Sequence, residues 1–240
     1  MNGRARTTGS DLAAPRTPRA DPSYDELRGA IVRGEIAPNS RLVESDISAF
    51  FAMSRGAVRN ALIRLEQEGL VVREPHRGAR VRQVSDHEAI EILQARAVLE
   101  GLAVRLTAER IDETGAERLR ECLALHRELL DSGDLLGASD ANAELHAALL
   151  ELSGHSTAQR LIRGLSAQMV RYQYRTILIP GRPAASQAEH AAIVEAVLAK
   201  APEQAEEAMR RHLFKVAEAL QSGRLPRIDS ASRGVFQPKG

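Results

Sequence analysis

The chain has 240 residues, of which 43% are hydrophobic and 3% aromatic, and its formal net charge is +1. Scarce aromatic side chains and the lack of Trp favour a core of Leu and Ala on packed helices. A single Cys excludes an internal disulfide framework and suits the cytoplasm, and no apolar run reaches the roughly 20 residues that a membrane span needs.

The N-terminal third is the basic part of the chain. Residues 1–84 carry 14 Arg against 10 Asp and Glu, whereas residues 85–240 carry 19 Lys and Arg against 22 acidic residues. A basic surface is what binding to a phosphate backbone requires. Residues 1–21 are rich in Gly, Pro, Thr and Arg without an apolar period, and we expect them to form a disordered arm.

Residues 22–84 predict a winged helix-turn-helix DNA-binding domain. A first helix runs from about residue 22 to 33 and ends at Gly34, and a turn and short strand cover 36–42. A second helix covers 44–51, and a tight turn leads into a third. The order helix, helix, turn, helix and hairpin is that of a DNA-binding module.

The third helix carries the side chains expected to read DNA. Ser54 is a good N-cap, apolar residues repeat at helical spacing over 57–65, and Gly69 stops the run. Arg55 and Arg59 lie four residues apart, so they share the face opposite the apolar stripe. An arginine can donate two hydrogen bonds to a guanine base or form an ion pair with a phosphate, and both roles are possible for Arg55 and Arg59. Ser54 is a cap and, in addition, a candidate phosphate contact.

The hairpin that follows has a basic tip. Residues 70–73 and 79–82 predict two short strands, and His76, Arg77 and Gly78 lie at the turn between them. We expect this tip to contact the adjacent minor groove or the DNA backbone, with Gly78 allowing close approach.

The stretch from Tyr24 to Arg82 resembles the N-terminal domain of the GntR superfamily of bacterial transcription regulators. Family members show Thr-Pro where this chain has Gly56-Ala57. The resemblance implies operator binding. It places Glu44, which lies in the first turn of its own helix, beside the DNA. A homodimer on paired half-sites is expected. The family core Ser-Arg-x-x-Val-Arg-x-Ala-Leu is matched by Ser54, Arg55, Val58, Arg59, Ala61 and Leu62.

Residues 85–222 predict an antiparallel all-helical bundle, which makes the fold mainly α. Glycine and proline positions separate the amphipathic stretches. The tail 223–240 has Pro, Ser and Gly without a period and is expected to be flexible. The six helices are predicted at 86–110, 112–131, 134–152, 156–178, 184–200 and 202–221.

Three histidines lie on three different predicted helices: His146, His190 and His212. Asn142 lies four residues before His146 and shares its face, whereas Asp140 is rotated away. A lone helical histidine is usually structural, so the residues alone do not establish a metal site. The histidines outside this set are predicted to lie at a helix boundary or on the surface, namely His155, His87 and His126.

The helical half, from about Asp86 to Leu220, resembles the FCD ligand-binding domain of FadR-type GntR regulators. That family shows Asp-x-x-x-His, then Glu-His-x-x-Ile, then Met-x-x-His-Leu, and this chain has Asn142 where Asp is common. The resemblance implies that a divalent ion (Zn, Ni or Mn) is bound by Asn142, His146, His190 and His212.

The resemblance also implies an acidic effector. Arg96 and Glu100 share a helix face, which indicates either an intrahelical ion pair or an arginine that points at the effector. The candidate effector-binding residues are Arg96, Gln168 and Arg171.

These observations predict a cytoplasmic transcription regulator, a repressor rather than an enzyme, controlled by a small carboxylate bound at a metal site. Two alternatives stay open. One is a regulator that responds to the metal without an organic ligand. The other is a metallohydrolase, which three histidines and an open metal position also describe.

Overall fold

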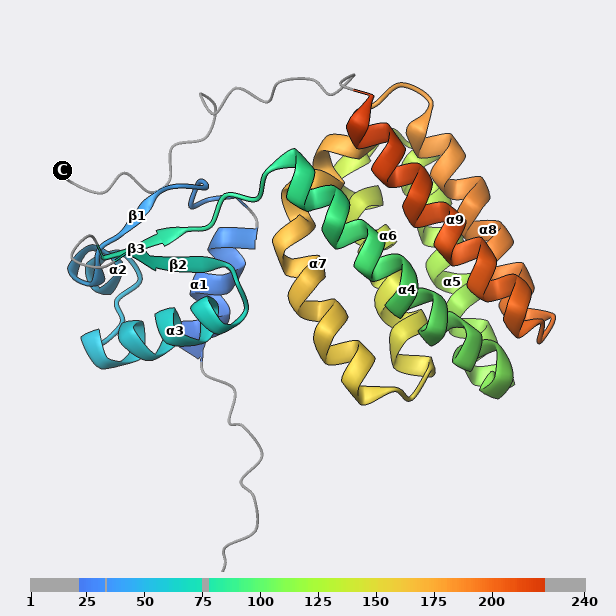
Figure 1. Ribbon diagram of the computed structural model, residues 1–240, viewed down its shortest axis with the longest axis horizontal. Coiled ribbons are helices and arrows are strands. Elements are labelled where there is room, and N and C mark those ends of the chain that lie inside the picture. The colour runs from blue at the N-terminus through green and yellow to red at the C-terminus, as the bar shows by residue number, and fades with distance from the viewer. Residues whose placement is uncertain (1–21, 33, 75–77, 223–240) are drawn as a thin grey trace, which may run out of the picture.

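The computed structural model describes residues 22–32, 34–74 and 78–222, which form a small N-terminal body and a larger helical body (Figure 1). The predicted arm 1–21 and tail 223–240 lie outside the described residues. The wing-tip residues His76 and Arg77 lie outside them as well.

The N-terminal body is a winged helix-turn-helix. Three helices pack on one side of a small antiparallel sheet, in which the strand order is β1-β3-β2. Its core includes Leu27, Ile47 and Leu62, which are almost completely buried. The elements are α1 (Pro22–Val32), β1 (Arg41–Leu42), α2 (Glu44–Phe50), α3 (Arg55–Gln67), β2 (Val71–Glu74) and β3 (Gly78–Val81).

The C-terminal body is a bundle of six helices, as predicted. Each helix begins and ends within two residues of its predicted bounds. Ser85, Asp112 and Asp134 each accept a hydrogen bond from a backbone N–H three residues on, so they cap the helices that follow them. The helices are α4 (Asp86–Arg110), α5 (Glu113–Asp131), α6 (Leu135–Leu152), α7 (Ser156–Ile177), α8 (Arg182–Leu198) and α9 (Pro202–Gln221).

Helix α7 lies on the side of the bundle that faces the winged helix (Figure 1). Ala167 of α7 is buried in the core of the winged helix, whereas Met169 is buried in the core of the bundle. At Gly69, which has a φ of +73°, a Cβ atom would lie 3.0 Å from Nε2 of Gln168. The bodies therefore meet closely along one helix.

Within the part of the chain that the structure describes, no helix combines the length and the apolar character that crossing a membrane demands.

Candidate functional site

The exposed face of α3 carries both arginines that the sequence singled out. Val58 and Leu62 of this helix are buried, which leaves Arg55 and Arg59 exposed on the opposite side. Ser54 accepts a hydrogen bond of 3.2 Å from the backbone N–H of Ala57 and is the N-cap of the helix. The cap fixes where the helix starts and therefore where the two guanidinium groups stand.

Glu44 lies in the first turn of α2 and forms an ion pair with Arg59 across the helix-turn-helix. Oε2 of Glu44 lies 3.1 Å from Nη2 of Arg59, whose side chain is 64% exposed. Gly78 opens β3 with a φ of +83°, a conformation that favours glycine. Glu44 and Gly78 line the same surface pocket, so the start of β3 lies close to the helix-turn-helix.

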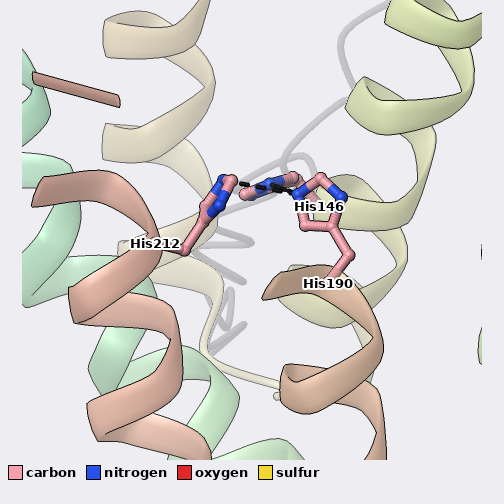
Figure 2. Close-up of side chains that lie close together, drawn as sticks. All are labelled: His146, His190 and His212. Atoms are coloured by element: carbon pink, nitrogen blue, oxygen red, sulfur yellow. Dashed lines mark hydrogen bonds between the residues drawn. The ribbon is translucent and has the colours of Figure 1, made fainter. Parts of the chain in front are cut away.

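The second site is a cluster of three buried imidazoles inside the bundle. Figure 2 shows His146 of α6, His190 of α8 and His212 of α9 converging from their three helices. Nε2 of His190 lies 3.3 Å from Nε2 of His146 and 3.3 Å from Nε2 of His212. One ligand atom from each of the three rings lies within 4.8 Å of the others.

Two carboxylates, the buried Glu100 and the partly buried Glu189, orient this cluster. Nδ1 of His146 lies 2.7 Å from Oε2 of Glu100, and Nδ1 of His212 lies 2.7 Å from Oε2 of Glu189. A ring that donates from Nδ1 to a carboxylate keeps the lone pair of Nε2 for a cation. The carboxylates therefore select the tautomers that aim both Nε2 atoms into the shared space.

The surroundings of the cluster favour the neutral forms of His190 and His212 and the ionised forms of Glu100 and Glu189. Burial lowers the pKa of His190 well below its usual value and lowers that of His212 to about 4. Burial alone would raise the pKa of Glu100, but the Arg96 guanidinium and His146 outweigh it and bring the pKa to about 2. Burial would likewise raise the pKa of Glu189, but His212 and Arg182 outweigh it and bring the pKa to about 2. Neutral imidazole is the form that binds a metal ion.

The residues present fit a divalent ion. Two nitrogens that each lie about 2.05 Å from a tetrahedral ion are about 3.3 Å apart, which is the separation of Nε2 of His190 from Nε2 of each of the other two histidines. Among the described residues, Oδ1 of Asn142 is buried without a hydrogen-bond partner, although buried carbonyl oxygens are normally paired. An unpaired oxygen on the wall next to three imidazoles suits a fourth ligand.

A pocket opens beside the cluster, with a cavity volume of about 70 Å³. His146 and His212 lie on its wall together with apolar side chains such as Leu93 and Met169. The polar part of the wall is formed by Arg96, Ser139, Asn142, Thr176, Arg182 and Ser186. An apolar pocket with a few convergent polar groups is the usual form of a small-molecule site.

The three predicted effector residues have different positions. Arg96 lines the pocket, and its Nε donates a 2.6 Å hydrogen bond to Oε1 of Glu100, so the intrahelical ion pair is present as well. Gln168 lies away from this pocket, at the junction with the winged helix, where its Oε1 accepts from Arg82 at 2.5 Å. Arg171 belongs to α7, and its side chain lies outside the described residues.

His126 was expected on the surface, and the structure corrects this. It is 2% exposed, its Nδ1 lies next to Oε1 of Gln187, and its ring centroid is 5.3 Å from that of His190. No local pattern predicts this burial, because the partners of His126 are on α8 and not at helical spacing on its own helix.

Sequence reasoning also missed Glu189 and Arg182. Glu189 directly precedes His190, yet it serves His212 on the neighbouring helix. Arg182 follows Gly181 at the start of α8, in a Gly-Arg-Pro triplet that indicated only a helix boundary. The Glu-His pair was the one available signal for Glu189.

Tyr172 of α7 connects the pocket to the segment between the two bodies. Its ring lines the pocket, and its hydroxyl lies 3.0 Å from the backbone carbonyl of Val84 and 2.9 Å from Oδ1 of Asp86. Val84 follows the wing strand β3, and Asp86 begins α4. A change in the pocket thus has a short path to the DNA-binding body.

Two family models match the chain. Residues 21–81 match the model described as bacterial regulatory proteins, gntR family, and residues 91–215 match the FCD domain. Together they span both bodies of the structure.

Curated relatives and a solved structure agree with these matches. The HTH-type transcriptional repressor RspR of Escherichia coli is 27% identical, covering 90% of this chain and 94% of that protein. The HTH-type transcriptional regulator BphR of Paraburkholderia xenovorans is 30% identical, covering 80% of each chain. The structure of E. coli McbR/YncC matches with a TM-score of 0.73 over 84% of this chain and 96% of that chain, at 21% identity, which bears on the fold alone.

Proposed function

This chain belongs to the gntR family of bacterial regulatory proteins and carries an FCD domain, and from that membership we propose that it is an operator-binding repressor controlled by a small carboxylate. It is a transcription regulator. The carboxylate binds beside a divalent ion in the pocket of the bundle. The observation that carries this proposal is the buried cluster of His146, His190 and His212, which reaches the pocket wall through His146 and His212 in a regulator of this family.

Operator binding is assigned to α3 and the wing. Arg55 and Arg59 enter the major groove, Ser54 and Glu44 lie at the edge of the contact, and the tip with Gly78 reaches the neighbouring groove or backbone. Figure 1 supports this arrangement, since α3 and the β2–β3 hairpin both lie in the body remote from the bundle core. A homodimer in the cytoplasm reads two half-sites about one helical turn apart.

The metal site is assigned to four residues: Asn142, His146, His190 and His212. The ion (Zn, Ni or Mn) supplies open positions that accept carboxylate or hydroxyl oxygen atoms of the effector. Glu100 and Glu189 hold two of the imidazoles in the binding tautomer, and the apolar wall limits access of water.

Control of DNA affinity is assigned to α7. Met169, Tyr172 and Thr176 face the pocket, while Ala167 and Gln168 contact the winged helix. An effector that binds one arrangement of these contacts better than another shifts the spacing of two winged helices in a dimer. Repression is supported by the similarity to RspR, which is a transcriptional repressor.

A metallohydrolase is disfavoured by the state of the two carboxylates beside the histidine cluster. Glu100 is bonded to Arg96 and His146, and Glu189 is bonded to Arg182 and His212. A general base needs a carboxylate that can take a proton from water. Both carboxylates instead have pKa values of about 2, which makes them weak bases.

Fluorescence anisotropy tests the proposal. The full chain is titrated onto DNA from upstream of its own gene, with excess random competitor DNA, and Arg55→Ala and Arg59→Ala are compared with Arg120→Ala. Arg120 is an exposed arginine of the bundle, so its loss matches the charge change without touching α3. We expect the two α3 variants to lose operator preference and the control to keep it.

The same titration separates the alternatives. Release of DNA by a carboxylate in the presence of Zn²⁺ supports the proposal, whereas release or binding driven by Zn²⁺ alone supports a metal-responsive regulator. Equal affinity for operator and random DNA at every salt concentration would falsify operator reading.

A further inference from the structure

Arg182 has an unused hydrogen-bond donor inside the pocket. It is the first residue of α8, and its side chain is 9% exposed. Nη2 donates a 2.9 Å hydrogen bond to Oε2 of Glu189, whereas Nη1 is buried and has no partner among the described residues. A buried donor of a charged group is costly to leave unpaired.

Glu189 cannot satisfy this second nitrogen in the observed arrangement. Its Oε2 already serves both Arg182 and His212, and its Oε1 lies 3.4 Å from Nζ of Lys215. The carboxylate therefore fixes one side of the guanidinium and leaves Nη1, on the other side, without a partner in a residue that lines the pocket.

Arg96, the other arginine on the pocket wall, differs in this respect. Its Nε is bonded to Glu100, and none of its nitrogens is both buried and without a partner. Glu100 in turn holds His146. Arg96 thus supports the imidazole cluster, and Arg182 has the donor that a ligand can use.

The charge near Arg182 favours an anion. Arg96, Arg182 and Lys215 form ion pairs with only two carboxylates, Glu100 and Glu189. These five side chains therefore carry one net positive charge. A planar guanidinium with a free N–H matches a carboxylate in geometry as well as in charge.

The size of the pocket restricts the anion. A cavity volume of about 70 Å³ is roughly half that of a cavity of about 150 Å³ that holds benzene. Apolar Leu93 and Met169 close one part of the wall, and the hydroxyls of Ser139 and Ser186 lie on the polar part. A compact acid fits this description, and an acid with an alkyl tail does not.

We propose that Arg182 is the residue that recognises the effector's carboxylate, through Nη1, and that the pocket selects compact carboxylic or hydroxycarboxylic acids. This inference rests on the proposed effector control. It gives Glu189 two tasks, since the same carboxylate oxygen holds the Arg182 guanidinium and the His212 imidazole in place.

Isothermal titration calorimetry of the full chain loaded with Zn²⁺ tests the assignment. The probes are glycolate, lactate and malonate, their neutral counterparts glycolamide and lactamide, and hexanoate as a tailed acid. The proteins are the wild type, Arg182→Gln, Arg182→Lys and the matched charge control Arg120→Gln. Zinc content and melting temperature are measured for each protein, so that a misfolded variant is recognised.

We expect at least one compact acid to bind the wild type and Arg120→Gln, with the amides and hexanoate binding at least ten-fold more weakly. In Arg182→Gln the affinity for the acid falls roughly ten- to hundred-fold, which is the loss of a charge-assisted hydrogen bond. Arg182→Lys keeps the charge and regains part of the affinity. If Arg182→Gln is poorly folded, the assignment of Arg182 is tested by the affinity of Arg182→Lys for the acid and by the ratio of the wild type's affinities for the acid and its amide.

Three results would overturn the assignment: equal affinity of wild type and a folded Arg182→Gln, equal affinity of acid and amide, or no binding of any compact acid to the wild type. The proposed function is tested apart from this by DNA anisotropy. Arg182-dependent binding of an acid that leaves DNA affinity unchanged contradicts effector control while the assignment of Arg182 stands.

Discussion

The hydroxyl of Tyr172 lies 3.0 Å from the backbone carbonyl of Val84, and the ring of the same side chain lines the pocket beside the histidine cluster. One residue therefore contacts both the ligand site and the segment that leads from the wing to the bundle. Such a contact can differ between two arrangements of the domains, which is what coupling between sites requires.

Tyr172→Phe is expected to weaken this coupling. The substitution keeps the ring in the pocket wall and removes the hydroxyl, so carboxylate binding is retained. The ratio of DNA dissociation constants with and without the carboxylate should fall by up to roughly ten-fold, the worth of about one hydrogen bond. Anisotropy measures it, and an unchanged ratio with intact ligand binding argues for another path.

Glu100→Gln is expected to damage the metal site and the fold together. Glu100 is 1% exposed and bonds both Arg96 and His146, so its loss leaves a buried arginine without its counter-ion. The free energy of unfolding should drop by about 3 kcal/mol. Zinc affinity should drop about 10- to 100-fold, as for other carboxylates that orient a ligand histidine. Urea unfolding and competition with a zinc-sensitive dye measure the two effects.

Asn142→Asp is expected to raise zinc affinity, and Asn142→Ala to lower it. A carboxylate is a stronger ligand than an amide oxygen, and the Oδ1 atom of Asn142 is already buried without a partner on the pocket wall. Competition titrations of the three proteins give the order directly. The same affinity in all three would remove Asn142 from the ligand set and leave three histidines.

Gly69→Ala is expected to destabilise the junction between the two bodies. Its φ of +73° costs a side chain about 1–2 kcal/mol, and the added Cβ meets Nε2 of Gln168 at 3.0 Å. In the double variant with Gln168→Ala, the loss of stability caused by the clash with Gln168 should disappear. The loss caused by the positive φ should remain. Gly56→Ala, in a helix with open space around it, is the control and should be neutral or slightly stabilising in urea unfolding.

Arg59→Ala is expected to reduce operator affinity without reducing the melting temperature. Its ion pair with Glu44 is exposed, and exposed pairs contribute little to stability. A base contact by arginine is worth roughly ten-fold or more in discrimination. A phosphate contact would instead weaken binding to operator and random DNA alike, so comparing both DNAs across salt concentrations distinguishes the two roles.

The fold was predictable because its signals are local. Caps such as Ser54, Asp112 and Asp134 and the 3.6-residue period fix the helix starts and the buried faces regardless of how the helices dock. The resemblance to the FCD domain then predicted that His146, His190 and His212 belong together, and the structure brings them together.

The supporting residues were not predictable from the same signals. Glu189 acts on His212 across the contact between α8 and α9, and Arg182 is tied to that contact through Glu189. His126 of α5 contacts Gln187 of α8, so each of these roles depends on how the helices pack. Gln168 shows how fine the distinction is. It is adjacent to Met169, yet the rotation of about 100° per residue directs one side chain to the winged helix and the other to the pocket.

Because α7 contributes Ala167 to the core of the winged helix and Met169 to the core of the bundle, the two halves are not interchangeable modules. A chimera that joins this sensor to a foreign DNA-binding domain must also graft the face of α7 around Ala167 and Gln168. Substitutions on the exposed side of α3 leave the contact with α7 intact. Exchange of the whole winged helix does not, because Ala167 is part of its core.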